Sequence, residues 1–394
     1  MLKLRGKAQV HNASLEMPRL LRVTSREDLP TSMRSKYALL IPIDHHASSA
    51  ASEGFASILV PGAGVAVDEL PGLSNSKNVF LLSEDFQYLA EGDIVRLNPE
   101  SGNVSTVFRK NTPNNSILLT ERCNHLCLMC SQPPKDVDDT WLLEDAFALV
   151  RMIPTDTPNI GFTGGEPTTY GNRFIELIET TKRNLPRTSV DVLTNGRAFK
   201  SESYAAKLGR VKHPDLQLGI PIYSDDPVRH DFIVQSEGAF DETLHGVLNL
   251  KRHGVRVEIR VVIHQQSLPR LVQTCEFIAR NLLFVDHVAL MGLEITGFTR
   301  ANLEQLWVDP YEYRDTLSEA IEVLRAYGLS CSIYNHQLCL INDDVHDVCR
   351  QSISDWKNEF LPACDSCAKM RSCGGFFSSQ VAFKHSEHIV PYAM

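Results

Sequence analysis

The chain has 394 residues, of which 43% are apolar, enough for two or three domains with hydrophobic cores. Its net charge of −9 disfavours nucleic acid as a partner, because broad binding to phosphates needs a basic surface. No run approaches the roughly 20 apolar residues of a membrane helix, and the first residues hold no apolar signal segment. We therefore expect a cytoplasmic protein with no membrane partner, in which ten cysteines indicate metal binding rather than disulfides.

Residues 1–114 are predicted to form a small β-rich domain. Short apolar runs, broken by Gly, Pro, Asn and Ser, occur at 38–43, 56–62, 78–83, 93–97 and 104–109. An open sheet edge in such a domain could take up an extended peptide. A domain that only supports the rest of the chain, or that mediates dimerisation, fits the same pattern.

Residues 115–300 alternate between strand and helix patterns. Near-continuous Val, Ile and Leu runs predict buried strands at 115–120, 159–165, 189–196, 216–223, 255–264 and 287–295. Helical spacing is clearest at 239–253, which ends before Gly254, and at 310–327, which Pro310 opens and Gly328 closes. Six such alternations predict an α/β fold, a partial six-fold (β/α) barrel with parallel strands.

Three unusual motifs follow three successive predicted strands. Cys123, Cys127 and Cys130 follow the first strand, "GGEP" (164–167) ends the second, and "TNG" (194–196) ends the third. Because active sites of such barrels lie at the carboxyl ends of the strands, we expect these motifs at one rim.

The three cysteines point to a metal site with an open coordination position. Thiolates suit iron–sulfur clusters and zinc, and a four-iron cluster normally takes four cysteines, so three leave one iron free for catalysis. A zinc site completed by His125 is an alternative that leaves GGEP and TNG without a role. Taken singly, the paired glycines and the TNG segment are also typical of turns.

The spacing Cys123-x3-Cys127-x2-Cys130 resembles the signature of the radical S-adenosylmethionine (SAM) superfamily. The resemblance implies a catalytic 4Fe-4S cluster whose open iron binds SAM, and reductive cleavage of SAM to a 5′-deoxyadenosyl radical. It also implies SAM contacts from the GGEP element to the amino group, from the TNG segment to the ribose, and from the residue before the third cysteine to adenine. These residues are Gly164, Gly165, Glu166, Pro167, Thr194, Asn195, Gly196 and Met129, the last standing where an aromatic is common.

Other residues near the same rim are weaker candidates. Arg260 lies inside the fifth predicted strand, where a charge needs a partner such as the SAM carboxylate, Glu258 or Glu294. Residues after the fourth strand could contact substrate, although each is equally typical of a capping or solvated side chain. These are Tyr223, Asp226, His230 and Asp231.

Residues 301–394 are predicted to form a helix followed by a metal-organised extension. The spacing Cys364-x2-Cys367-x5-Cys373 resembles a shortened SPASM or twitch-type extension of peptide-modifying radical SAM enzymes, with Phe377 at the last cysteine position. The resemblance implies one auxiliary 4Fe-4S cluster, with Cys339 as fourth ligand and Cys349 as the alternative. A structural zinc on the same residues fits the spacing too. Cys275 and Cys331 are expected in the core.

Three longer segments resemble the His-Xaa-Ser system radical SAM maturases. They are "LLTERCNHLCLMCSQPP", "GLEITGFTRANLEQLWVDPYEY" and "SISDWKNEFLPACDSCAKMRSCGGFF". The resemblance implies modification of a small ribosomally made precursor peptide, with an electron donor such as flavodoxin or ferredoxin. A radical SAM enzyme acting on a small molecule or tRNA is one alternative, and the acidic charge disfavours tRNA. A non-catalytic iron–sulfur or zinc protein is the alternative from another class.

Overall fold

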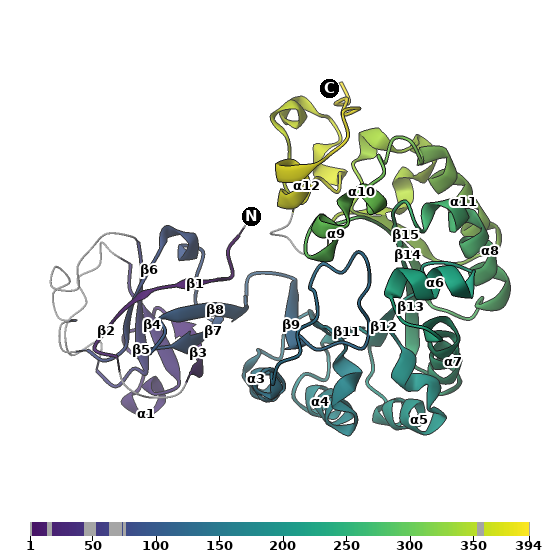
Figure 1. Cartoon of the computed structure of the whole chain (residues 1–394). Helices are drawn as coiled ribbons and strands as arrows, with labels where there is room; N and C mark the ends of the chain where they lie inside the picture. Colours follow the sequence, from purple (N-terminus) through teal and green to yellow (C-terminus); the bar gives the residue numbers. More distant parts are fainter. Residues whose placement is uncertain are drawn as a thin grey trace. The chain divides into compact units, whose positions relative to one another are not determined.

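The computed structural model describes residues 2–13, 18–42, 53–62, 73, 76–352 and 358–393. Residue 43 of one predicted strand and residues 353–357 of the tail segment lie outside this description. The chain forms two compact units, residues 2–117 with 145–158, and residues 118–144 with 159–394 (Figure 1). Within the described ranges, no helix combines the length and apolar character needed to cross a bilayer.

The N-terminal unit is built on one eight-stranded sheet with the order β1-β8-β7-β3-β4-β5-β6-β2. Val23, Leu59, Phe80 and Val95 are fully buried in its core. The strands are β1 (Arg5–Lys7), β2 (Gln9–His11), β3 (Arg19–Thr24), β4 (Tyr37–Leu40), β5 (Ser57–Pro61), β6 (Val79–Leu82), β7 (Ile94–Asn98) and β8 (Asn103–Phe108), with the short helix α1 (Thr31–Arg34) before β4.

One N-terminal segment occupies both edges of this sheet. Strand β1 pairs with β8 and strand β2 pairs with β6, although only Ala8 separates β1 from β2 in the chain. An extended peptide that joined this sheet at an edge would pair with the outer side of β1 or of β2, because these are its outermost strands.

The second unit contains an eight-stranded sheet in the order β16-β15-β14-β13-β12-β11-β10-β9, curved into a nearly closed, barrel-like form (Figure 1). The pairs from β10 to β16 are all parallel. The strands are β9 (Asn114–Thr120), β10 (Asn159–Gly164), β11 (Ser189–Leu193), β12 (Leu216–Pro221), β13 (Arg256–Ile263), β14 (His287–Gly292), β15 (Cys331–Tyr334) and β16 (Cys349–Arg350). The α/β class is thus confirmed, and β15 and β16 extend the sheet beyond the predicted strands.

Helices alternate with these strands. They are α3 (Thr140–Met152), α4 (Asn172–Asn184), α5 (Glu202–Val211), α6 (Pro227–Val234), α7 (Ala239–Arg252), α8 (Leu271–Asn281), α9 (Phe298–Ala301), α10 (Leu303–Leu306), α11 (Arg314–Ala326) and α12 (Ser378–Phe383). Helix α11 begins later than the predicted residue 310, because Asp309 closes a turn by accepting the Tyr311 and Glu312 N–H groups. Residues 145–158, which include the second half of α3, group with the N-terminal unit, where Asp145 pairs with Arg96 at 2.6 Å.

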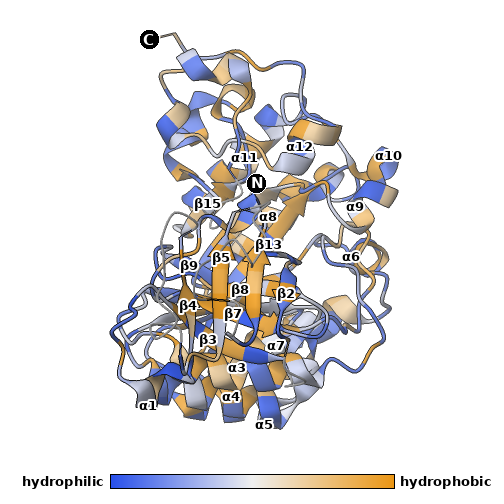
Figure 2. Ribbon diagram, turned by 90° about the vertical axis from the view of Figure 1, so that its left-hand side faces the viewer, coloured by the Kyte–Doolittle hydropathy of each residue, from blue (hydrophilic) through white to orange (hydrophobic). Residues whose placement is uncertain are grey.

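Along strand β13, buried apolar and charged side chains alternate between the two faces of the sheet. Val257, Ile259 and Val261 are fully buried on one face, whereas Glu258 and Arg260 alternate onto the other. Figure 2 shows apolar residues concentrated on the strands, while helices such as α4 and α5 carry both polar and apolar residues. The second face of β13 therefore carries the charges of Arg260 and Glu258 that the sequence places inside this predicted strand.

Helix α7 packs directly on the turn that follows β11. A Cβ atom on Gly246 would lie 2.2 Å from the carbonyl oxygen of Gly196. The Thr243 hydroxyl donates to the Asn195 carbonyl at 3.0 Å, which fixes the same turn from the same helix. This contact requires glycine in mid-helix and thereby positions the TNG segment.

Replacing Gly246 with Ala should destabilise the protein by about 1–3 kcal/mol, because the overpacking outweighs the gain of about 1 kcal/mol in helix propensity. Urea unfolding would measure the change. Leu248→Ala is the matched control on the same helix, since Leu248 is 46% exposed and its loss should cost no more than about 0.5 kcal/mol. A Gly246→Ala variant as stable as the parent would contradict the close packing.

Candidate active site

The loop after β9 carries Cys123, Cys127 and Cys130, each partly buried and each a free thiol. The Cys130 N–H donates to the Cys127 carbonyl at 3.0 Å, and the His125 N–H donates to Cys123 Sγ at 3.4 Å. These local bonds fold the segment back on itself. The three thiols therefore lie along one tight turn at the carboxyl end of β9.

Two other elements hold this cysteine loop in place. At the end of α6, the Val234 carbonyl accepts the Leu126 N–H at 3.2 Å, and the Ile233 carbonyl accepts the Leu128 N–H at 2.9 Å. On the other side, the Thr299 hydroxyl donates to the Met129 carbonyl at 3.0 Å. The loop is thus fixed through its main chain, which leaves the thiols available as ligands.

The electrostatics of the three thiols suit a cationic metal cluster. Burial raises the pKa of Cys123 to about 11, and it also raises the pKa values of Cys127 and Cys130. The neighbouring thiolates raise the pKa of Cys127 further. Ligated iron supplies the positive charge that keeps such thiolates ionised, so these residues fit an iron–sulfur cluster. Within the described chain, no three His, Cys, Asp or Glu side chains form a site for a single metal ion.

The GGEP segment lies against the start of the cysteine loop. The Gly165 N–H donates to the Thr120 carbonyl at 2.8 Å, and the Glu166 N–H donates to the Arg122 carbonyl at 2.8 Å. A Cβ atom on Gly165 would lie 2.0 Å from that Arg122 oxygen, and Gly164 has a φ of +148°. The paired glycines are therefore required by close backbone approach beside Cys123.

Glu166 is 1% exposed, and its carboxylate accepts four hydrogen bonds from the chain itself. Thr168 donates from its N–H at 2.9 Å and from its hydroxyl at 2.6 Å. From the TNG segment, the Thr194 hydroxyl donates at 2.7 Å and the Asn195 N–H at 2.6 Å. Burial raises the pKa of Glu166, and these four donors act against that rise. Glu166 thus ties β10 to β11, and its contact with the SAM amino group stays a prediction.

The TNG segment is bonded to the cysteine loop as well. The Asn195 side-chain amide donates to Asn124 Oδ1 at 2.6 Å, and Gly196 takes the left-handed φ of +79°. The three motifs therefore form a closed ring of hydrogen bonds, from the cysteine loop to Glu166, from Glu166 to Asn195, and from Asn195 back to Asn124. Asn124 was not among the predicted site residues, although its place beside Cys123 was the available signal.

Met129 and Arg260 have partners inside the chain. Met129 is 7% exposed and packs in an apolar cluster with Ile233, Leu293 and Leu306. Arg260 Nε pairs with Glu258 Oε1 at 2.5 Å, which is one of the pairings that the sequence analysis allowed. The proposed contacts of Met129 with adenine and of Arg260 with SAM stay predictions.

The four substrate candidates after β12 have different surroundings. Asp226 caps α6 by accepting the Val228 N–H at 3.0 Å, and Asp231 accepts the N–H groups of Gly238 and Phe240. His230 is buried and accepts the Tyr223 N–H at 3.2 Å. Tyr223 itself packs against the apolar cluster beside Cys127. Tyr223 is therefore the member of this group that the structure brings to the cysteine loop.

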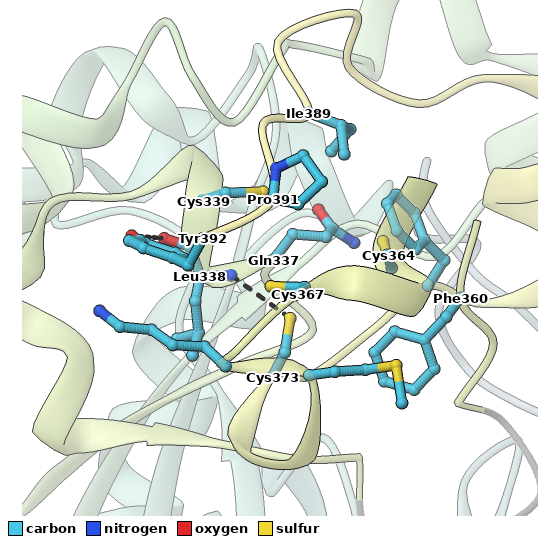
Figure 3. A pocket seen from close by; sticks show the side chains of 13 residues that line it. Gln337, Leu338, Cys339, Phe360, Cys364, Cys367, Cys373, Ile389, Pro391 and Tyr392 are labelled. Atoms are coloured by element: carbon cyan, nitrogen blue, oxygen red, sulfur yellow. Dashed lines mark hydrogen bonds between the residues drawn. The ribbon is translucent and has the colours of Figure 1, made fainter. Parts of the chain in front are cut away.

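A second group of thiols lines a pocket in the tail (Figure 3). The pocket has an empty volume of about 350 Å³, and Phe360, Phe376 and Tyr392 form part of its wall. The Leu338 N–H donates to Cys373 Sγ at 3.5 Å, which fixes one thiol at this wall. The lining thiols are Cys339, Cys364, Cys367 and Cys373.

Cys349 is not part of this lining. It lies on β16, where its thiol donates to the Val345 carbonyl at 3.4 Å. Burial raises the pKa values of Cys339 and Cys373, and neighbouring thiolates raise them further. The tail pocket therefore presents four thiols, the kind of ligand that iron–sulfur clusters take. As these side chains lie in the described structure, they do not converge on a site for a single ion such as zinc.

Residues 117–278 match the family model described as the radical SAM superfamily. This range includes the cysteine loop, the GGEP segment and the TNG segment. The match covers less than half of the chain and supports a likeness of this part to the radical SAM superfamily.

Curated relatives align with part of the chain. A Fe-coproporphyrin III synthase of Methanosarcina barkeri is 30% identical over 155 residues, 38% of this chain and 37% of its own. A "Probable GTP 3′,8-cyclase" of Methanocella arvoryzae is 30% identical over 196 residues, 45% of this chain and 61% of its own. A pre-heme d1 synthase of Dinoroseobacter shibae is 29% identical over 182 residues, 44% of this chain and 43% of its own. The chain thus spans between 37% and 61% of the length of these relatives.

Solved structures give similar partial matches. Streptococcus suis SuiB bound to S-adenosylmethionine has a TM-score of 0.48 and 16% identity, covering 57% of this chain and 51% of SuiB. The anSMEcpe structure with bound AdoMet has a TM-score of 0.43 and 18% identity, covering 55% of this chain and 63% of that one.

Changing Glu166 to Gln should lower the free energy of unfolding by about 1–3 kcal/mol, because an amide NH2 in place of Oε2 would face the Asn195 N–H and could not accept its hydrogen bond. Thermal unfolding would measure the loss. Glu176→Gln is the matched control, since Glu176 is exposed on α4 and pairs only loosely with Arg173 at 3.5 Å, so little change is expected. Equal stability of the two variants would rule out Glu166 as the link between the segments.

Proposed function

We propose that this chain is a cytoplasmic radical SAM enzyme that cleaves S-adenosylmethionine reductively and modifies a ribosomally made peptide of the His-Xaa-Ser type. The observation that carries the radical SAM part is the closed ring of hydrogen bonds that joins the cysteine loop, Glu166 and the TNG segment at one rim. The peptide part rests on the sequence resemblance of the catalytic and tail segments to His-Xaa-Ser maturases.

The chain's own residues have separable tasks in this proposal. Cys123, Cys127 and Cys130 would hold the catalytic cluster, which when bound supplies the electron that cleaves SAM to the 5′-deoxyadenosyl radical. Glu166 keeps the GGEP and TNG segments at fixed positions for the cofactor. The apolar cluster around Met129 excludes water from one side of the cysteine loop, which protects a reactive radical from side reactions.

The tail thiols are assigned to one auxiliary 4Fe-4S cluster, held by Cys339, Cys364, Cys367 and Cys373. Cys339 is preferred to Cys349 because it lines the pocket together with the other three. A structural zinc ion is the competing occupant on ligand chemistry, since zinc also takes four thiolates, although the described side chains do not converge on a single-ion site.

A small-molecule substrate is the second candidate. It is favoured by the curated relatives, which are named as a Fe-coproporphyrin III synthase, a probable GTP 3′,8-cyclase and a pre-heme d1 synthase. In either case the reaction needs an external electron, which we assign to a flavodoxin or ferredoxin.

Replacing Cys123, Cys127 and Cys130 together with Ala should abolish 5′-deoxyadenosine formation under dithionite, because the SAM-binding cluster loses its ligands. Chromatography of anaerobic reactions measures the product. Cys349→Ala is the control variant and should retain cleavage. Co-expression with a His-Xaa-Ser precursor peptide should give a mass change in the peptide that the triple variant does not produce. Continued SAM cleavage by the triple variant would overturn the assignment.

Metal analysis separates the two possible tail occupants. Two four-iron clusters give about eight iron and eight sulfide per reconstituted chain, whereas a tail zinc gives about four iron and one zinc. Cys339→Ser should lose the tail metal while the catalytic cluster persists, and Cys349→Ser should keep both. Loss of the tail metal in Cys349→Ser but not in Cys339→Ser would reverse the choice of fourth ligand.

A further inference from the structure

A second pocket lies at the same rim as the cysteine loop. It has an empty volume of about 390 Å³. Ile263 and Gly292, the last residues of β13 and β14, form its floor with Leu293. Trp307 and Val308, before α11, form one wall. The tail supplies the opposite wall with Gln380, Lys384, His385 and Ser386.

Two residues connect this rim pocket to the two thiol sites. Leu293 lines the rim pocket and also belongs to the apolar cluster that packs against Cys127. Gln337 lines both the rim pocket and the four-thiol pocket. The rim pocket therefore lies between the site assigned to SAM chemistry and the site assigned to the auxiliary cluster.

The wall of the rim pocket is rich in hydrogen-bond donors. Ser386 is 3% exposed; its oxygen accepts the His388 N–H at 3.0 Å, and the same hydroxyl can also donate its proton. Gln337 is also 3% exposed, and its amide donates to the Gly375 carbonyl at 2.6 Å, which leaves it a second N–H. Buried donors of this kind require an acceptor when the site is filled.

Lys384 provides the positive charge of the rim pocket. Its ammonium group lies 4.0 Å from the centre of the Trp307 ring, which also lines the pocket. None of the described residues that line the pocket is Asp or Glu. Within the same described part of the chain, Lys384 forms no ion pair with a carboxylate, unlike Lys369, which pairs with Asp343.

We propose that the rim pocket binds a carboxylate of the substrate, with Lys384 as its counter-ion and the Ser386 hydroxyl as a donor. A single lysine matches the single charge of a carboxylate. The carboxylate can come from the end of a peptide or from an acidic side chain. This inference rests on the proposed function and narrows it, because it assigns an acidic group to the substrate.

The test is anaerobic titration calorimetry of the reconstituted protein with three small probes. N-acetylserine carries a terminal carboxylate, N-acetylglutamic acid α-amide carries a side-chain carboxylate, and N-acetylserinamide carries neither. At least one acid should bind about tenfold more tightly than the amide, in line with a charge-assisted hydrogen bond. The acid that binds more tightly identifies the source of the carboxylate.

Variants of Lys384 test whether the rim pocket causes the preference for acids over the amide. Lys384→Gln should remove the preference for acids, and Lys384→Arg should retain it. Lys207→Gln is the matched control, since it removes the same charge from α5, where Lys207 contacts Asn172 at 2.9 Å. Equal binding of acids and amide by the parent, or an unchanged preference in Lys384→Gln, would overturn the proposal. SAM cleavage without a probe, measured on the same samples, tests the proposed function separately.

Discussion

The buried carboxylate of Glu166 is the interaction on which the candidate site depends. An ionised carboxylate inside a protein is costly unless donors surround it, and here four donors do so. Two donors come from the segment after β10 and two from the segment after β11. Satisfying one charge therefore fixes the separation of two strand ends. The Asn195 contact with Asn124 then extends that constraint to the cysteine loop.

The same rim is held by backbone contacts that leave no room for side chains. Gly165 lies against the Arg122 carbonyl, and a Cβ atom on Gly297 would lie 2.4 Å from the Cys130 carbonyl. Gly246 does the same for the turn at Gly196. These glycines come from three different elements and converge on the segments beside the thiols. The cysteine loop is thus positioned by main-chain contacts from several elements, together with the side chain of Asn124.

Periodicity predicted where the barrel strands lie along the chain, because runs such as 255–264 are long and rich in Val and Ile. Motif spacing placed the cysteines, GGEP and TNG after successive strands. Strands β15 and β16 were missed because they are short and their pairing is decided by distant contacts. The pairing of Arg260 with Glu258 was not decided either, since alternation gives the face of a side chain and not its partner. The hydrogen-bond ring through Glu166 could not be predicted, because it depends on distances between residues that are far apart in the sequence.

The tail contributes to two different sites, although the cysteine spacing predicted only one of them. It carries the four thiols, and it also supplies the wall of the rim pocket through Gln380 and Lys384. The Gln380 amide approaches the Leu293 carbonyl at 3.4 Å, so α12 reaches the end of the barrel sheet directly. Gln337 borders both cavities, which makes the occupancy of one relevant to the shape of the other. Removing the tail would therefore remove the four proposed metal ligands and a pocket wall together. Only single substitutions, such as those at Cys339 and Lys384, separate the contribution of the metal from that of the wall.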